Sequence, residues 1–133
     1  MRIFRLLYVS TALVAPHTVA PAILRVSRRD NVARGITGCL LCTRSNYAQV
    51  LEGATDAVMT LIGRIATDPR HQDVHIVSTR NSSSRLYASW AMAYAPGAPL
   101  EAFLWETVRD QSRSALVEEH LMRALRPSLH DTT

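Results

Sequence analysis

The sequence predicts an α+β fold of the ferredoxin-like type, a five-stranded mixed sheet with two helices on one face and C-terminal helices packed on the other. The length of 133 residues and the hydrophobic fraction of 47% suit one domain with a substantial core. Short apolar segments and longer segments of helical spacing follow in the order strand, helix, strand, strand, helix, strand, strand. Two amphipathic stretches near the C-terminus can cover the second face of the sheet.

The first strand and helix follow from alternation and spacing. Phe4 to Ser10 has the apolar alternation of a strand. The amphipathic segment after it, from Thr18 as a capping residue to about Asn31 or Ala33, predicts a helix. Pro21 is compatible with this helix because it would fall in the first turn.

The rest of the sheet is predicted as a hairpin, a second helix and two more strands. In chain order the segments are Ile36 to Thr43, Tyr47 to Gly53, a helix capped by Thr55 and stopped at Asp68-Pro69, Val74 to Ser78, a loop from Thr79 to Ser84, and Trp90 to Ala95.

Pro96 divides the chain into two parts. We expect residues 1–96 to form the sheet domain and residues 97–133 to form a C-terminal helical extension. The extension carries two apolar stripes, Leu100, Phe103, Leu104 and Val108, and then Leu116, Val117, His120, Leu121, Ala124 and Leu125. The stripes can pack on the open face of the sheet or offer a surface to a partner or a second copy, and packing is favoured at roughly two to one.

Composition and motifs argue against several classes of function. The net charge is +4 and all 15 basic residues are arginines, but they are scattered, so nucleic-acid binding has about one chance in ten. There is no glycine-rich phosphate loop, no nucleophile motif and no pair of carboxylates on one element, which indicates that the chain is not an enzyme. His71 and His75 lack helical geometry, so we expect no metal site.

The N-terminus and the cysteines indicate where the protein works. Residues 1–15 imitate a secretory signal, but polar residues interrupt the apolar run and a first strand fits better. No apolar run reaches the roughly 18 residues that span a bilayer. Cys39 and Cys42 lie three apart on one strand and point to opposite faces, so we expect two thiols in a reducing compartment. These features predict a soluble cytoplasmic protein.

Gln49 is the unusual residue of the predicted sheet. It lies in the apolar strand from Tyr47 to Gly53, at a position where Val or Ile is normal. A buried amide without hydrogen-bond partners costs about 1–3 kcal/mol. Either the neighbouring backbone or a ligand must therefore supply hydrogen bonds to the Gln49 amide. The sequence of the strand does not decide between these two alternatives.

Five segments together resemble a known family. They are Leu7-Tyr8-Val9-Ser10, Asn31 with Gly35-Ile36-Thr37-Gly38-Cys39-Leu40-Leu41, Gln49-Val50-Leu51-Glu52-Gly53, Ile65 with Asp68-Pro69-Arg70-His71, and Arg85 with Tyr87, Trp90 and Met92. In order and spacing they resemble the BLUF domains, flavin-based blue-light sensors, over roughly Arg2 to Ala95. Asp30 departs from the family, which often has Asn or His there, and an acid would weaken or retune flavin binding.

The resemblance implies FAD, with FMN or riboflavin as alternatives, bound noncovalently between the two helices. Asn31 would bond the N3 and O4 edge, Gln49 would sit between Tyr8 and the N5 and O4 edge, and Arg70 would reach the C2 carbonyl. Arg64 would contact the phosphate side or the ring. The implied cofactor-binding residues are Tyr8, Ile23, Ser27, Asn31, Gln49, Arg64, Arg70 and His71.

The resemblance also implies a photochemical role for Tyr8 and Gln49, with Trp90 and Met92 exchanging places on signalling. Tyr8 would transfer an electron and a proton to the excited flavin, and Gln49 would relax into a rotated or tautomeric form. The signal would pass in trans to a downstream protein, and a homodimer is allowed. The alternative is a light-insensitive ferredoxin-like module that binds RNA or an acidic protein partner.

Overall fold

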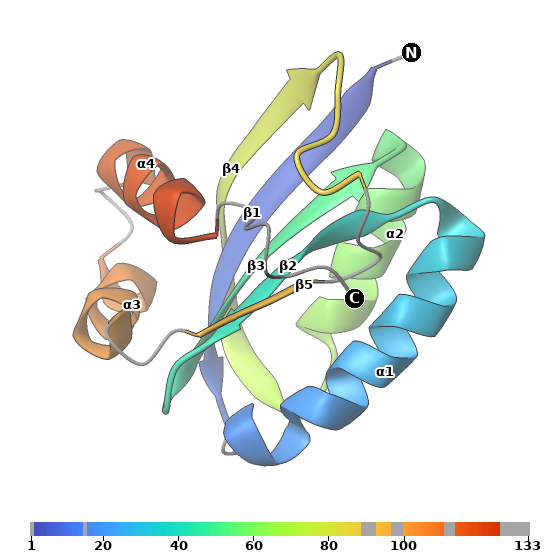
Figure 1. Cartoon of the computed structure of the whole chain (residues 1–133). Coiled ribbons are helices and arrows are strands. Elements are labelled where there is room, and N and C mark those ends of the chain that lie inside the picture. The colour runs from blue at the N-terminus through green and yellow to red at the C-terminus, as the bar shows by residue number, and fades with distance from the viewer. Residues whose placement is uncertain (1, 15, 89–92, 97–99, 111–113, 126–133) are drawn as a thin grey trace.

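Strands and helices alternate along the chain much as the hydrophobic pattern predicts (Figure 1). The computed structural model describes residues 2–14, 16–88, 93–96, 100–110 and 114–125. Its elements are β1 (Ile3–Ala12), α1 (Pro16–Arg34), β2 (Thr37–Cys42), β3 (Asn46–Gly53), α2 (Thr55–Ala66), β4 (His71–Ser82), β5 (Ala93–Pro96), α3 (Glu101–Arg109) and α4 (Ser114–Ala124).

The strands lie in the order β4-β1-β3-β2-β5. The four longer strands form an antiparallel sheet, and the four residues of β5 align parallel to β2 at its edge. The α+β class is therefore confirmed. β1 and β3 are central neighbours, and every residue of β3 is buried because helices cover both faces of the sheet there.

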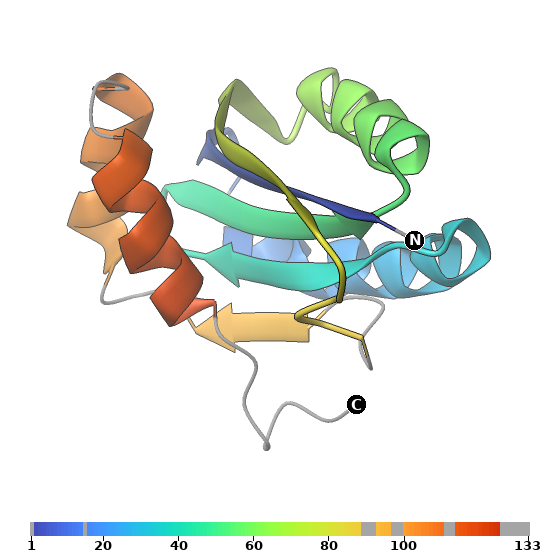
Figure 2. The same cartoon turned by 90° about the horizontal axis from the view of Figure 1, so that it is seen from above.

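Successive residues of the central strands point to opposite faces of the sheet. The figures show α1 and α2 on one side of the sheet and α3 and α4 on the other (Figures 1 and 2). Leu6 and Tyr8 pack toward α1 and α2, whereas Leu7 and Val9 pack toward α3 and α4. Two separate hydrophobic layers result, one on each face.

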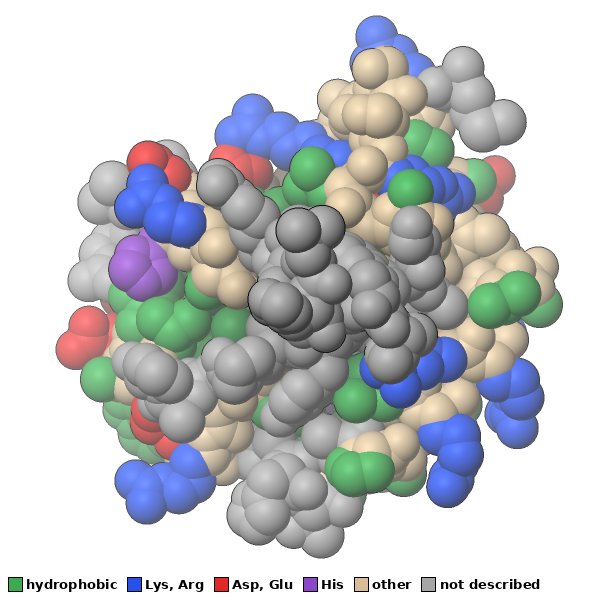
Figure 3. All heavy atoms as spheres, viewed as in Figure 1, with side chains coloured by type: hydrophobic (Ala, Val, Ile, Leu, Met, Phe, Trp, Pro, Cys, Tyr) green, Lys and Arg blue, Asp and Glu red, His purple; other side chains and the backbone are tan. Residues whose placement is uncertain are grey.

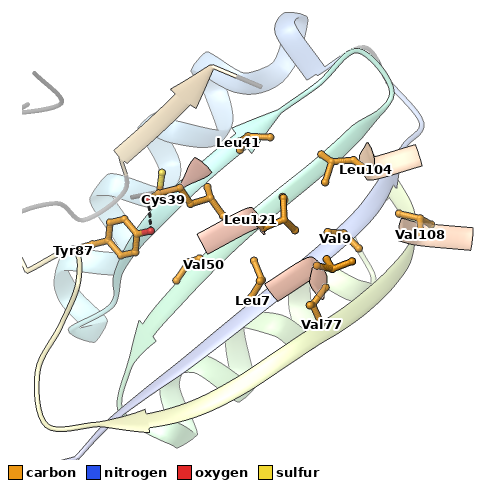
Figure 4. Packing of buried hydrophobic residues seen from close by; sticks show 13 residues of the cluster. Leu7, Val9, Cys39, Leu41, Val50, Val77, Tyr87, Leu104, Val108 and Leu121 are labelled. Atoms are coloured by element: carbon orange, nitrogen blue, oxygen red, sulfur yellow. Dashed lines mark hydrogen bonds between the residues drawn. The ribbon is translucent and has the colours of Figure 1, made fainter. Parts of the chain in front are cut away.

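The layer under α3 and α4 is a continuous apolar cluster, which we call the closed-face core (Figure 4). Both predicted C-terminal stripes contribute to it, and the Tyr87 hydroxyl donates a hydrogen bond to the carbonyl of Leu125. Its buried members are Leu7, Val9, Cys39, Leu41, Ala48, Val50, Val77, Tyr87, Leu104, Val108, Val117, Leu121 and Leu125.

The two thiols lie on opposite faces, as their spacing predicts. Cys39 belongs to the closed-face core, and Cys42 packs in the layer under α1 and α2. Both are buried, and neither takes part in a disulfide. Because the sheet separates them, they cannot join in a disulfide without moving a strand.

The predicted fourth strand is too short, and the loop expected after it is wrong. β4 begins at His71 and continues to Ser82, so it takes in most of the segment from Thr79 to Ser84. Among the described strands, β4 lies at the edge of the sheet and pairs with β1 alone, and Thr79, Arg80 and Asn81 are exposed. Polar side chains on such an edge reach water, so hydrophobic pattern does not reveal the strand.

The starts of both long helices also differ from prediction. α1 begins at Pro16, a residue type favoured in a first helical turn, so Pro21 lies inside the helix. Ala54 occupies the N-cap position of α2, and Thr55 is its first residue. Of the predicted strand from Trp90 to Ala95, the structure describes the part from Ala93; Trp90 and Met92 lie outside the described residues.

Candidate functional site

A hydrogen bond joins the two central strands at Tyr8 and Gln49. The residues lie opposite each other in the β1–β3 register. The Tyr8 hydroxyl donates to Gln49 Oε1 at 2.6 Å, and the residues are only 3% and 4% exposed. Burial raises the pKa of Tyr8 far above its ordinary value, so the phenol stays protonated at neutral pH. One partner of the buried amide is therefore a phenol on the neighbouring strand.

A cavity of about 250 Å³ lies beside this hydrogen bond, between the sheet and the helices α1 and α2. We call it the helix-side cavity. All eight cofactor-binding residues implied by the family resemblance line it. The full lining is Tyr8, Ile23, Val26, Ser27, Asp30, Asn31, Arg34, Leu40, Tyr47, Gln49, Leu61, Arg64, Ile65, Asp68, Arg70 and His71.

Each helix reaches the cavity with one stripe of side chains. On α1 the lining residues recur three or four positions apart, as do the residues from Leu61 to Asp68 along α2 and its end. The sequence analysis identified Ile23, Ser27 and Asn31 but not Val26 or Arg34. Extending the helical period from those three positions would have found the missing residues of α1.

The lining suits a flat ring system with polar edges. Ile23, Leu40 and Ile65 offer apolar surface, and the amides of Asn31 and Gln49 can donate and accept hydrogen bonds. Asn31 is 2% exposed, and its backbone carbonyl accepts a hydrogen bond of 2.9 Å from the amide of Ile36. A flavin ring has apolar faces and an edge of carbonyls and nitrogens, so the residues fit it.

Arg70 is held in place by Asp68, a lining residue that the sequence placed at the end of a helix and in a family-like segment but not among the cofactor-binding residues. Arg70 Nε lies 3.0 and 3.1 Å from the two Asp68 oxygens, and the backbone amide of Arg70 donates to Asp68 Oδ1 at 2.9 Å. These hydrogen bonds hold the pKa of Asp68 below its ordinary value. The pair fixes a cationic group at one end of the cavity.

His71 is a wall of the cavity, and its two ring nitrogens are engaged by the protein. Nε2 donates to the carbonyl of Ile65 at 2.5 Å, since a carbonyl can only accept. Nδ1 lies 2.9 Å from the hydroxyl of Ser10. The ring also meets Tyr8 edge to face, with centroids 6.3 Å apart. We therefore expect His71 to contact a ligand through ring surface and not through a hydrogen bond.

Two other residues of the family-like segments, Glu52 and Arg85, lie outside the cavity. Glu52 is fully buried, pairs with Arg5 at 3.2 Å and accepts a hydrogen bond of 2.5 Å from the backbone amide of Tyr87. Arg85 donates to the carbonyl of Gly35 at 2.7 Å. These bonds hold the segment after β4 against the sheet, which is a structural role.

On one face of the molecule, the described arginines are spread out in several separate groups (Figure 3). Among the described residues, carboxylates pair with Arg5, Arg29, Arg44, Arg70, Arg80 and Arg123. Such pairing lowers the positive field that nucleic-acid binding requires.

Two kinds of site are missing from the part of the chain that the structure describes. There, no three metal-ligating side chains come together. None of its helices is both long and apolar enough to cross a bilayer.

Comparison with known proteins identifies the family. The model for "BLUF: Sensors of blue-light using FAD" matches residues 3–93. The photoactivated adenylate cyclase subunit beta of Euglena gracilis is 41% identical over 83 residues, which make up 62% of this chain and 10% of that protein. The chain thus spans about a tenth of the length of these curated Euglena relatives.

Solved structures of similar shape agree with this match. BlrB, a BLUF protein in its dark state, is 30% identical with a TM-score of 0.73, over 92% of this chain and 96% of that one. BlrP1 of Klebsiella pneumoniae, solved with FMN and cyclic diGMP, is 28% identical with a TM-score of 0.67, over 87% of this chain and 33% of that one. The family model covers most of the chain and all of the helix-side cavity, and the chain therefore belongs to the BLUF family of flavin-based blue-light sensors.

Proposed function

We propose that this chain is a blue-light receptor that holds FAD noncovalently in the helix-side cavity and signals through the Tyr8–Gln49 pair. The observation that carries the proposal is the hydrogen bond of 2.6 Å between Tyr8 and Gln49 at the wall of that cavity. A buried phenol bonded to a buried amide forms a path for a proton, because the amide can both accept and donate.

The binding roles follow from the lining. Asn31 and Gln49 supply hydrogen bonds to the ring edge, and Ile23 packs against the ring. Arg70, oriented by Asp68, supplies a positive charge near a carbonyl oxygen. Arg64 and Ser27 lie on the helices that flank the cavity and are our candidates for the contacts beyond the ring.

A bound flavin absorbs blue light and is a strong electron acceptor when excited. Tyr8 would supply an electron to the excited flavin and release its proton toward Gln49, and the electron and the proton would then both return to Tyr8, so that no product leaves. Gln49 relaxes into a rotated or tautomeric form with a changed hydrogen bond to the ligand. The side chain of one residue then biases the packing of the strands around it. Trp90 and Met92 stay our predicted switch residues.

The choice of FAD rests on the family description, and FMN is the rival, since the similar BlrP1 was solved with it. A cavity of about 250 Å³ is just below the range of roughly 300–1,000 Å³ for sites that enclose a whole ligand of moderate size. This volume suits the ring system, which is common to FAD, FMN and riboflavin. The mass of the flavin released from purified protein decides between them.

We place the output in the C-terminal extension, residues 97–133, and the flavin site in residues 1–96. Supporting this division, α3 and α4 pack on the sheet face opposite the cavity, and Tyr87 joins that face to Leu125 through a hydrogen bond. The partner that reads the change is a separate protein in this proposal, and a second copy of the chain is the alternative.

Absorption spectroscopy tests the proposal. The purified full chain should be yellow and should show flavin bands that shift to longer wavelength in blue light and return in the dark. A colourless chain that also fails to take up added FAD would refute flavin binding. A flavin-loaded chain with no light-induced shift would refute the receptor role but would leave the proposal of flavin binding intact.

A further inference from the structure

Tyr47 is a second buried phenol in the helix-side cavity. It lies two residues before Gln49 on β3, so both side chains point to the same face of the sheet. The residue is 3% exposed, and its ring meets the His71 ring nearly at a right angle, with centroids 5.6 Å apart. Nothing in the proposed photochemistry uses it.

The hydroxyl of Tyr47 is buried and makes no hydrogen bond in the part of the chain that the structure describes. This is unusual, because buried tyrosine hydroxyls nearly always have a partner. Phenylalanine would fill the same space without carrying an unpaired polar atom.

Two polar residues near Tyr47 have other partners. Both ring nitrogens of His71 are taken by Ser10 and Ile65. The Arg70 guanidinium is bonded to the Asp68 carboxylate. The missing partner is therefore best supplied from the cavity itself.

We infer that the Tyr47 hydroxyl is a further ligand-binding group, which donates a hydrogen bond to an acceptor atom of the flavin. The inference rests on the proposed function. The ring of Tyr47 packs against His71, the chain neighbour of Arg70, which puts this contact near Arg70 in the lining of the cavity. Burial raises the pKa of Tyr47 to about 12, so the phenol keeps the proton that it donates.

The test is Tyr47→Phe in the full chain, with two measurements. Release of flavin from the loaded protein should become about tenfold faster, because one hydrogen bond to the ligand is lost. The melting temperature of the flavin-free protein should be no lower than that of the wild type, because the variant removes an unpaired buried hydroxyl. If the hydroxyl had only a structural role, Tyr47→Phe would leave flavin release unchanged and would lower the melting temperature of the flavin-free protein.

Tyr87→Phe is the matched control. Its hydroxyl is bonded to the Leu125 carbonyl in the closed-face core, away from the cavity. This variant should lower the melting temperature of the flavin-free protein and leave flavin release unchanged. Tyr47→Phe should therefore speed flavin release without lowering the melting temperature, whereas Tyr87→Phe should lower the melting temperature without changing flavin release.

Infrared spectra give a third readout that needs no flavin-free protein. Loss of a donor to a flavin carbonyl should shift a carbonyl stretching band to higher frequency in Tyr47→Phe. Unchanged flavin release and unchanged bands in Tyr47→Phe would overturn the inference, and so would a destabilised flavin-free variant. Failure of the wild type to bind flavin would instead overturn the proposed function.

Discussion

The two faces of the sheet differ sharply although the same strands build them. On the face of α3 and α4, Ala48 and Val50 of β3 join an apolar core that contains side chains from both C-terminal helices. On the face of α1 and α2, the alternate positions carry Tyr47 and Gln49, and these border a cavity. Protein side chains fill one face completely, whereas the other face has polar groups whose hydrogen bonds a ligand can complete.

A small domain can thus use one face of its sheet for stability and the other for a ligand site. The closed-face core buries large aliphatic residues and anchors the strands, so that the cavity on the other face has rigid walls. Because the side chains alternate, a substitution can change one face with little direct effect on the other. Substitutions on either face can therefore test whether the two faces act independently.

Tyr8→Phe should abolish the light-induced spectral shift while flavin stays bound. The variant keeps the ring but removes the proton and the hydrogen bond to Gln49. Difference spectra before and after blue illumination measure the loss. Tyr87→Phe, on the closed face, should keep a normal shift; a normal shift in Tyr8→Phe itself would refute the donor role.

Leu121→Ala should destabilise the fold by about 2–5 kcal/mol, because Leu121 is fully buried in the closed-face core and its removal leaves a cavity. Urea unfolding of the flavin-free chain measures this. The flavin release rate should change little. A large change in the flavin release rate of Leu121→Ala, alongside the loss of stability, would show that the two faces are not independent.

Asn31→Ala should weaken flavin binding about tenfold, the effect of losing a buried hydrogen bond to the ligand. Fluorescence titration measures the affinity. Asn81→Ala is the control, since Asn81 is exposed on β4, away from the cavity. Equal affinities for Asn31→Ala and the wild type would remove Asn31 from the site.

Asp68→Asn should have the smallest effect and a distinctive pH dependence. Hydrogen bonds from Arg70 keep the folded-state pKa of Asp68 below the unfolded value of about 4. The pair therefore stabilises the fold above pH 4, and this contribution disappears as the pH falls through the lower folded-state pKa. At neutral pH it should be below about 1 kcal/mol, because the pair is partly exposed.

The test compares the urea unfolding of the wild type and Asp68→Asn at pH 7 and at pH 3. The difference between them should shrink at the lower pH. A difference that is constant, or that grows as the pH falls, would show that the carboxylate does not stabilise the fold through Arg70.

Much of the fold could be predicted because local pattern and burial agree in the central strands. The alternation from Phe4 to Ser10 and from Tyr47 to Gly53 places Tyr8 and Gln49 on one face, where the structure has them. The second half of the edge strand β4 was not predicted, because its polar side chains are exposed to solvent and their pattern does not differ from that of a loop.

The sequence alone was enough to predict the order of the elements, the two faces of the central strands and, through the five family-like segments, eight of the residues that line the cavity. The hydrogen bonds of those residues depend on the folded structure. It paired Arg70 with Asp68, engaged both nitrogens of His71 and left the Tyr47 hydroxyl without a protein partner. Alternation follows from the backbone of a single strand, whereas a hydrogen bond depends on which side chains from distant elements meet.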